Sequence, residues 1–270
     1  CKRYQRNVAG IAELKALLGI TTIQPVIPQI LLDQIETGDF EYEEKSSRSY
    51  NPIQCLTREV RGTLMANHGY RYNYDIEAAA PTLLLQYAQQ INNNFQAPAL
   101  THYINNRAEV RDQIATDCII KPEHVKFVIN ALLNGAVISQ YRENKILAHL
   151  NYDYDAITRL QHHTVLADIR RDISAMWKTL KVTFPVRYNT NCNGKQISAR
   201  LTSKQKSGLY RELESQCARV IRSYLRKNKI KVFWEHDGWR CDKAVYTTEL
   251  AREVKRQTGF VIKLDEAVYE

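Results

Sequence analysis

Two aspartates stand at positions where a carboxylate can do chemistry. Asp75 follows "YNY" and precedes a helical pattern, and Asp237 follows an apolar run within "VFWEHDG". A small sheet presents side chains at its edge in such positions. Carboxylates brought together repel and lose hydration, so a divalent cation is their natural partner. The alternative for each aspartate alone is that it caps a turn.

A basic helical segment, "KPEHVKFVINALLNGA", lies between the two aspartates. Lys121, His124 and Lys126 stand near its start. Lys126, Asn130 and Asn134 share one face because they are spaced by four residues. Facing a cleft, this lysine would contact a triphosphate held by metal ions, since paired Mg²⁺ ions can activate a 3′-hydroxyl. The alternative is a solvated basic face.

Composition favours a polyanionic partner. Lys plus Arg number 38 against 29 Asp plus Glu, which gives a formal charge of +9. This balance suits nucleic acid, although a merely soluble basic protein would share it. We expect no membrane partner, because no apolar run approaches the roughly 20 residues of a membrane span. The six cysteines show no CxxC spacing, so we expect reduced thiols and a cytoplasmic location.

The expected elements are those of an α+β protein with a small antiparallel sheet and many helices. Residues 40–50 read as loop and 59–77 as a hairpin that turns at "NHG". A strand pair is expected around 230–242, a last strand at 260–264 and an irregular hairpin or loop at 183–196. Helices are expected at 7–18, 28–37, 79–91, 97–116, 122–135, 137–149, 153–180, 203–227 (from Thr202 or Ser203) and 246–257 (closed by Gly259).

Four segments, in this order, resemble those of the family-A DNA polymerases and the single-subunit phage-type RNA polymerases. "SRSYNPIQCLTREVRGTLMA" is similar to the family's Arg, Ser, Asn and Gln stretch. "YNYDIEAAAPTLLLQYA" resembles motif A, and Lys126 with Gly135 nine residues later resembles motif B. "VFWEHDG" resembles motif C. The resemblance covers roughly residues 45–270.

The resemblance implies a palm and fingers architecture with a reduced or absent thumb. The palm would comprise residues 45–94 and 181–270, and a largely helical fingers subdomain residues 95–180. Residues 1–44 would form an N-terminal helical segment that serves as a reduced thumb or contacts a partner. An additional protein subunit is therefore an expected partner.

The resemblance also implies roles for individual residues. Asp75 and Asp237 would be catalytic and would bind two Mg²⁺ ions, or Mn²⁺, with help from the backbone carbonyl of Ile76. His236 would hold the primer terminus. The implied nucleotide-binding residues are Lys126, Lys121, His124, Asn130, Asn134 and Ala80, and Arg48, Gln54 and Arg61 would join His236 in binding primer and template.

Three positions depart from the family pattern. Ala80 stands where the DNA polymerases carry a Glu that blocks a 2′-hydroxyl, and Asn134 stands where an aromatic abuts the incoming base. Pro122 replaces the family's second basic residue. The small Ala80 favours an RNA product, whereas the upstream "SRSYNPIQ" stretch resembles the DNA-making branch, so the sequence leaves the product open.

The resulting expectation is a template-directed nucleotidyltransferase that extends a 3′-hydroxyl with nucleoside triphosphates. Its partners would be a nucleic-acid template and primer. An RNA polymerase or primase is favoured over the alternative, a small family-A-like DNA polymerase for phage or plasmid replication. A third hypothesis is a non-catalytic nucleic-acid-binding protein with a degenerate palm.

Overall fold

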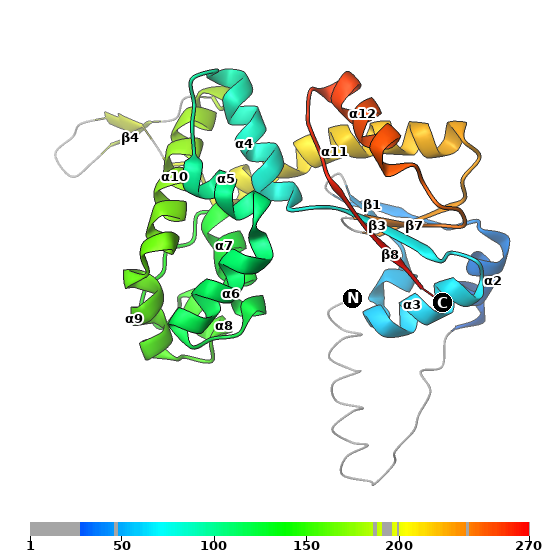
Figure 1. Cartoon of the computed structure of the whole chain (residues 1–270), viewed down its shortest axis with the longest axis horizontal. Helices are drawn as coiled ribbons and strands as arrows, with labels where there is room; N and C mark the ends of the chain where they lie inside the picture. Colours follow the sequence, from blue (N-terminus) through cyan, green and yellow to red (C-terminus); the bar gives the residue numbers. More distant parts are fainter. Residues whose placement is uncertain are drawn as a thin grey trace, which may run out of the picture. The chain divides into compact units, whose positions relative to one another are not determined.

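The computed structural model describes residues 28–45, 48–185, 188–190, 196–198, 200–235 and 238–269. By its internal contacts the chain divides into two compact units. The first combines residues 1–77 with 215–270, and the second is the continuous segment 78–214. We call them the sheet unit and the helical unit (Figure 1). The division falls within the long helix α11 (Ser203–Lys227).

The sheet unit is built on an antiparallel sheet whose strands come from distant parts of the chain. Its described strands follow the order β6-β7-β3-β8, so β3 is interior. The other elements surround this sheet or form a separate β1–β2 hairpin. The elements are α2 (Gln29–Thr37), β1 (Glu43–Lys45), β2 (Arg48–Tyr50), η1 (Pro52–Cys55), α3 (Arg58–Asn67), β3 (Tyr72–Ile76), β6 (Val232–Trp234), β7 (Gly238–Cys241), α12 (Thr247–Thr258) and β8 (Leu264–Val268).

Both faces of this sheet are covered, because its strands carry large apolar residues on both sides. Phe233 belongs to one buried cluster with Ile35 of α2 and Met65 of α3. On the opposite face Tyr74 stacks on Trp239, with ring centroids 5.8 Å apart. Figure 1 shows α3 on one side of the sheet and α12 on the other.

The helical unit packs around α10 (Thr164–Leu180). This helix contacts α4, α5, α7 and α9. Its buried Asp172 accepts a hydrogen bond from the Leu100 N–H in the first turn of α5 at 3.0 Å, and the Trp177 indole donates to the Leu133 carbonyl at 2.8 Å. The remaining elements are α4 (Ala79–Ile91), α5 (Pro98–Asn105), α6 (Arg107–Cys118), α7 (Pro122–Leu133), α8 (Lys145–His149), α9 (Tyr154–His162), η2 (Lys181–Thr183), β4 (Tyr188–Thr190) and β5 (Gln196–Ser198).

Several predicted elements are present. The α+β class with a small antiparallel sheet is confirmed, and α2, α4, α11 and α12 match their predicted ranges closely. Thr202 caps α11, since its hydroxyl accepts from the Gln205 N–H at 3.2 Å and the Gln205 side chain accepts from the Thr202 N–H at 2.9 Å. This reciprocal pair is a capping box. Gly259 ends α12 in the left-handed region, with φ 78°.

The hairpin predicted for 59–77 is wrong. Its first half is the helix α3, and only its second half is a strand, β3. The Thr57 hydroxyl accepts from the Val60 N–H at 3.4 Å and starts the helix, while Met65 is fully buried in the core cluster. A cap and helical burial spacing therefore override the β-like composition of "TREV".

Other boundaries also differ from expectation. Residues 40–50 contain the β1–β2 hairpin rather than loop alone. The helix predicted at 137–149 is limited to Lys145–His149, because the Asn144 side chain caps that helix and donates to the Val137 carbonyl at 2.7 Å. The range 153–180 holds two helices that meet at His163, and the last strand begins at Leu264 rather than at 260.

Some expectations concern residues that the structure describes only in part. The helix at 7–18 lies outside the described residues, as does part of 183–196, which includes β4 and β5. None of the helices in the described ranges is long and apolar enough to cross a membrane. Cys118, Cys217 and Cys241 are buried and form no disulfide, whereas Cys55 is disulfide-bonded, so the expectation of reduced thiols is wrong for Cys55.

Candidate functional site

Asp75 lies one residue before the end of β3, with strands on both sides. In the sheet register it is paired with Gly238 on β7 and with Asp265 on β8. Residues directly opposite in antiparallel strands point to the same face, with Cβ atoms about 4.5–5.5 Å apart. Asp75 and Asp265 are therefore two carboxylates on one face of the sheet. Carboxylate oxygens are the donors that Mg²⁺ prefers, so these two side chains have the chemistry of Mg²⁺ ligands.

The "EHDG" stretch ends in a glycine, Gly238, at a point where β7 lies very close to β3. A Cβ added at this residue would lie 2.4 Å from the Tyr74 carbonyl oxygen. Side chains do not tolerate such an approach to backbone, so β7 can come this close to β3 only with glycine here. The glycine therefore keeps the residue that follows Asp237 in register with Asp75.

Glu235 anchors the start of the same stretch through two arginines. Arg61 of α3 binds the carboxylate with two hydrogen bonds, Nε to Oε1 at 3.0 Å and Nη2 to Oε2 at 3.1 Å. Arg240 of β7, only 1% exposed, donates from Nε to Oε1 at 2.7 Å. Bidentate charge-assisted bonds are strong and fix geometry. The ends of the β6–β7 connection are thus tied to each other and to α3.

A second set of charges surrounds Tyr269, which follows β8. The Arg240 guanidinium lies 4.5 Å from its ring centroid. Burial would raise the pKa of Tyr269, but hydrogen bonds from Arg58 and Arg240 outweigh burial and lower it. The pKa of Arg58 is raised, first by its hydrogen bond to Tyr269 and more weakly by the charges of Glu235 and Asp75. This face of the sheet unit therefore combines carboxylates with arginines.

The structure places the predicted primer-binding residues as follows. Gln54 is 8% exposed, and its Nε2 donates to the Trp234 carbonyl at 2.8 Å. Arg61 binds Glu235 and also donates to the Gln54 carbonyl at 3.0 Å. Arg48 belongs to β2. His236 and Asp237 lie outside the described residues. Roles for these residues in binding nucleic acid stay predictions.

The predicted nucleotide-binding residues of α7 belong to the helical unit. Lys126 and Asn130 are exposed on this helix, while Val125 and Ile129 are buried. The structure therefore bears out the helix and its solvent-facing side. A triphosphate contact for Lys126 stays a prediction.

Side chains hold α7 at its C-terminal end and against α8. Lys121 is its exposed N-cap residue. Asn134 ends it, and its Nδ2 donates to the Asn130 carbonyl at 2.9 Å. His124 Nδ1 lies 3.1 Å from His149 Nε2, a hydrogen bond that holds α7 to α8.

The residues after Asp75 follow the strand–Asp–helix order that the sequence predicts. Ile76 ends β3 and is buried, and it pairs with Leu264 of β8. Ala80 is in the first turn of α4 and is half-buried. Ala78, at the N-cap, has a φ of 45° in the left-handed region, so the chain turns sharply between strand and helix.

Sequence reasoning missed Glu235, Arg240, Arg58, Tyr269 and Asp265. Arg240 carries a usable signal, because an arginine between Trp239 and Cys241 in an apolar strand requires a buried partner. Asp265 carries none, since its place opposite Asp75 depends on strand pairing across most of the chain. Among the described residues, no group of three or more His, Cys, Asp or Glu side chains is arranged to hold a metal ion.

Comparison with known proteins leaves the family open. No protein-family model matches the sequence, and no curated protein matches it. The residues and their geometry are therefore the basis on which a function can be proposed.

Proposed function

We propose that this protein is a template-directed nucleotidyltransferase that extends a 3′-hydroxyl with nucleoside triphosphates. The observation that carries the proposal is the register of β3. Asp75 stands opposite Gly238, and Gly238 is covalently bonded to Asp237. Paired strands lie about 4.8 Å apart, so this register keeps Asp75 close to the residue bonded to Asp237, and the proposal requires the Asp237 side chain to turn to the same face as Asp75.

The chain's own residues would divide the work. Asp75 and Asp237, with the Ile76 carbonyl, would bind two Mg²⁺ ions. When bound, these ions supply an activated 3′-hydroxyl and charge stabilisation for the leaving pyrophosphate. His236 would position the primer end. The Glu235 clamp, in which the Glu235 carboxylate binds Arg61 and Arg240, would hold the connection that contains His236 and Asp237. The exposed Lys126 of α7 would contact the triphosphate.

The proposed architecture matches the two units only in part. In this proposal residues 45–94 and 181–270 form the palm, residues 95–180 the fingers and residues 1–44 a reduced thumb. The palm then includes residues 78–94 and 181–214, which belong to the helical unit. The partners are a primer and template, and the +9 charge supports a polyanion. Three of the four described cysteines form no disulfide, which supports a cytoplasmic location, whereas the Cys55 disulfide does not.

The product we propose is RNA, with DNA as the alternative. A small residue at Ala80 leaves room for a ribose at the place where a bulky side chain would exclude it. A non-catalytic nucleic-acid-binding protein is the competing class, which the net charge alone would equally fit.

A primer-extension assay tests the proposal. Purified protein is given labelled primer on DNA or RNA template, Mg²⁺, and either all four rNTPs or all four dNTPs. We expect template-dependent extension that Asp75→Asn abolishes and that Asp112→Asn, an exposed change in α6, leaves intact. Extension that survives Asp75→Asn unchanged would remove Asp75 from the mechanism, and no extension on any template would favour the binding protein.

A further inference from the structure

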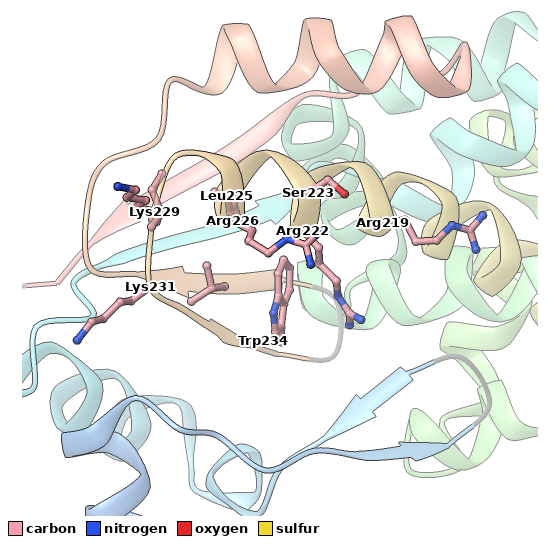
Figure 2. Close-up of a pocket in the computed structure, with 10 residues that line it drawn as sticks. Arg219, Arg222, Ser223, Leu225, Arg226, Lys229, Lys231 and Trp234 are labelled. Atoms are coloured by element: carbon pink, nitrogen blue, oxygen red, sulfur yellow. The ribbon is translucent and has the colours of Figure 1, made fainter.

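A pocket of about 720 Å³ lies between α11 and β6 in the sheet unit. Among its described lining residues there is no acidic side chain, and half of them are basic. Figure 2 shows the basic side chains along α11 and the segment that leads into β6. They are Arg219, Arg222, Arg226, Lys229 and Lys231. Such an accumulation of one charge raises the local concentration of anions.

The three arginines are spaced as a row along one face of the helix. Arg219, Arg222 and Arg226 are three and four residues apart, and all are exposed. At 1.5 Å per residue, the row spans roughly 10 Å. A row of separate positive charges fits a ligand whose negative charges repeat along its length. Guanidinium groups also match phosphate oxygens through paired hydrogen bonds.

Trp234 forms the wall of the pocket and is held in place from both sides of its backbone. Its N–H donates to the Tyr42 hydroxyl and its carbonyl accepts from Gln54, each at 2.8 Å. The Arg222 guanidinium lies 4.9 Å from the centroid of the indole ring (Figure 2). This cation–π contact holds the arginine in place before a ligand arrives, which reduces the entropy lost on binding.

We infer that this pocket binds the phosphate backbone of a nucleic-acid strand. The inference rests on the proposed function only in taking nucleic acid as the partner, and it assigns a surface separate from Asp75. β6, which forms one wall, leads directly into Glu235 and the "EHDG" stretch. A nucleic-acid strand bound here would therefore contact β6, which leads to Asp237 in the sequence.

An anionic membrane fits this pocket less well. A membrane-binding surface combines basic residues with apolar side chains that enter the lipid. In the part of the chain that the structure describes, no large exposed apolar side chain lines the pocket. Trp234 is half-buried beneath Arg222 and is not free to insert.

The test is fluorescence anisotropy with a labelled single-stranded oligonucleotide in EDTA over a series of salt concentrations. The site variant is Arg219→Gln/Arg226→Gln. Its matched control is Arg142→Gln/Lys145→Gln, which removes the same charge from exposed positions of the helical unit. We expect the site variant to bind roughly tenfold more weakly and its salt slope to fall by about 1.4, since each phosphate contact on a single strand contributes about 0.7.

A charge-conserving variant separates geometry from charge. Arg222→Lys keeps the charge but loses the planar stacking on Trp234, so we expect several-fold weaker binding with the salt slope unchanged. Circular dichroism checks that each variant is folded.

Two outcomes would overturn the inference. One is that the two double variants have equal effects, which includes no effect of either. The other is that the site variant loses binding to anionic-lipid vesicles while it still binds the oligonucleotide. Asp75→Asn should bind the oligonucleotide normally in EDTA. The binding surface and the proposed catalysis therefore succeed or fail independently.

Discussion

Glu235 joins α3 and β7 through one carboxylate, since Arg61 and Arg240 both bind it. Arg240 is almost wholly buried, and a buried charge is costly unless it is paired. The carboxylate also directly precedes His236 and Asp237 in the sequence. We therefore expect the Glu235 carboxylate to contribute to the stability of the sheet unit.

We predict that Glu235→Gln destabilises the protein by roughly 3 kcal/mol, because two arginines lose their counter-charge while the shape is kept. The measurement is urea unfolding followed by circular dichroism. Glu253→Gln is the matched control, because its ion pair with Arg256 is on the surface of α12, and its midpoint should stay near wild type. Equal shifts for the two variants would show that the clamp has no special role.

The sugar selectivity is expected to depend on Ala80. We predict that the wild type uses rNTPs at least as well as dNTPs, and that Ala80→Glu lowers the ratio of kcat/KM for rNTP over dNTP by roughly tenfold. Glu77→Ala, a change in the preceding turn, is the control and should leave the ratio unchanged. A strong dNTP preference that collapses in Glu77→Ala would show that the chain makes DNA and that Glu77 is the gate.

At the scale of elements, the approach of β7 to β3 depends on Gly238. We predict that Gly238→Ala lowers both stability and primer extension, because the added methyl would lie 2.4 Å from the Tyr74 carbonyl oxygen. Gly208→Ala within α11 is the control. Nothing lies within 4 Å of its added methyl, and alanine should stabilise the helix by about 0.5–1 kcal/mol. A neutral Gly238→Ala would mean that the strands can separate without cost.

The contact between α7 and α8 is expected to depend on pH. Burial, and then the neighbouring His124, lower the pKa of His149 below its ordinary value of 6.5. As pH falls through 6.5, the unfolded chain takes up a proton before the folded one does, so stability decreases. We predict that an NMR titration gives His149 a pKa below 6.5, and that this pKa is higher in His124→Asn. A titration at or above 6.5 in the wild type would contradict this.

Local patterns predicted much of the fold. The strand–Asp–helix order around Asp75, the β6–β7 pair and all of α11 follow from periodicity and capping residues near each element. For α3, the Thr57 cap is a local signal that the prediction missed, whereas the burial of Met65 against distant residues has no local signal. The pairing of β3 with β8 likewise joins segments far apart in sequence, so Asp265 had no local signal.

At the scale of the whole molecule, the residues proposed for function are distributed over both units. Asp75, Glu235 and the basic pocket all belong to the sheet unit, while Lys126 belongs to the helical unit. Binding of metal ions and binding of a nucleic-acid strand are therefore expected properties of the sheet unit's own residues. The triphosphate contact proposed for Lys126 is supported by sequence order alone.

Asp75 and Asp237 are proposed to bind the same metal ion, and a crystal structure with Mn²⁺ tests this because anomalous scattering identifies the metal. We expect an anomalous peak between the two side chains, with metal–oxygen distances of about 2.1 Å and carboxylate oxygens roughly 3–5 Å apart. A peak that touches neither aspartate, or side chains on opposite faces of the sheet, would contradict it.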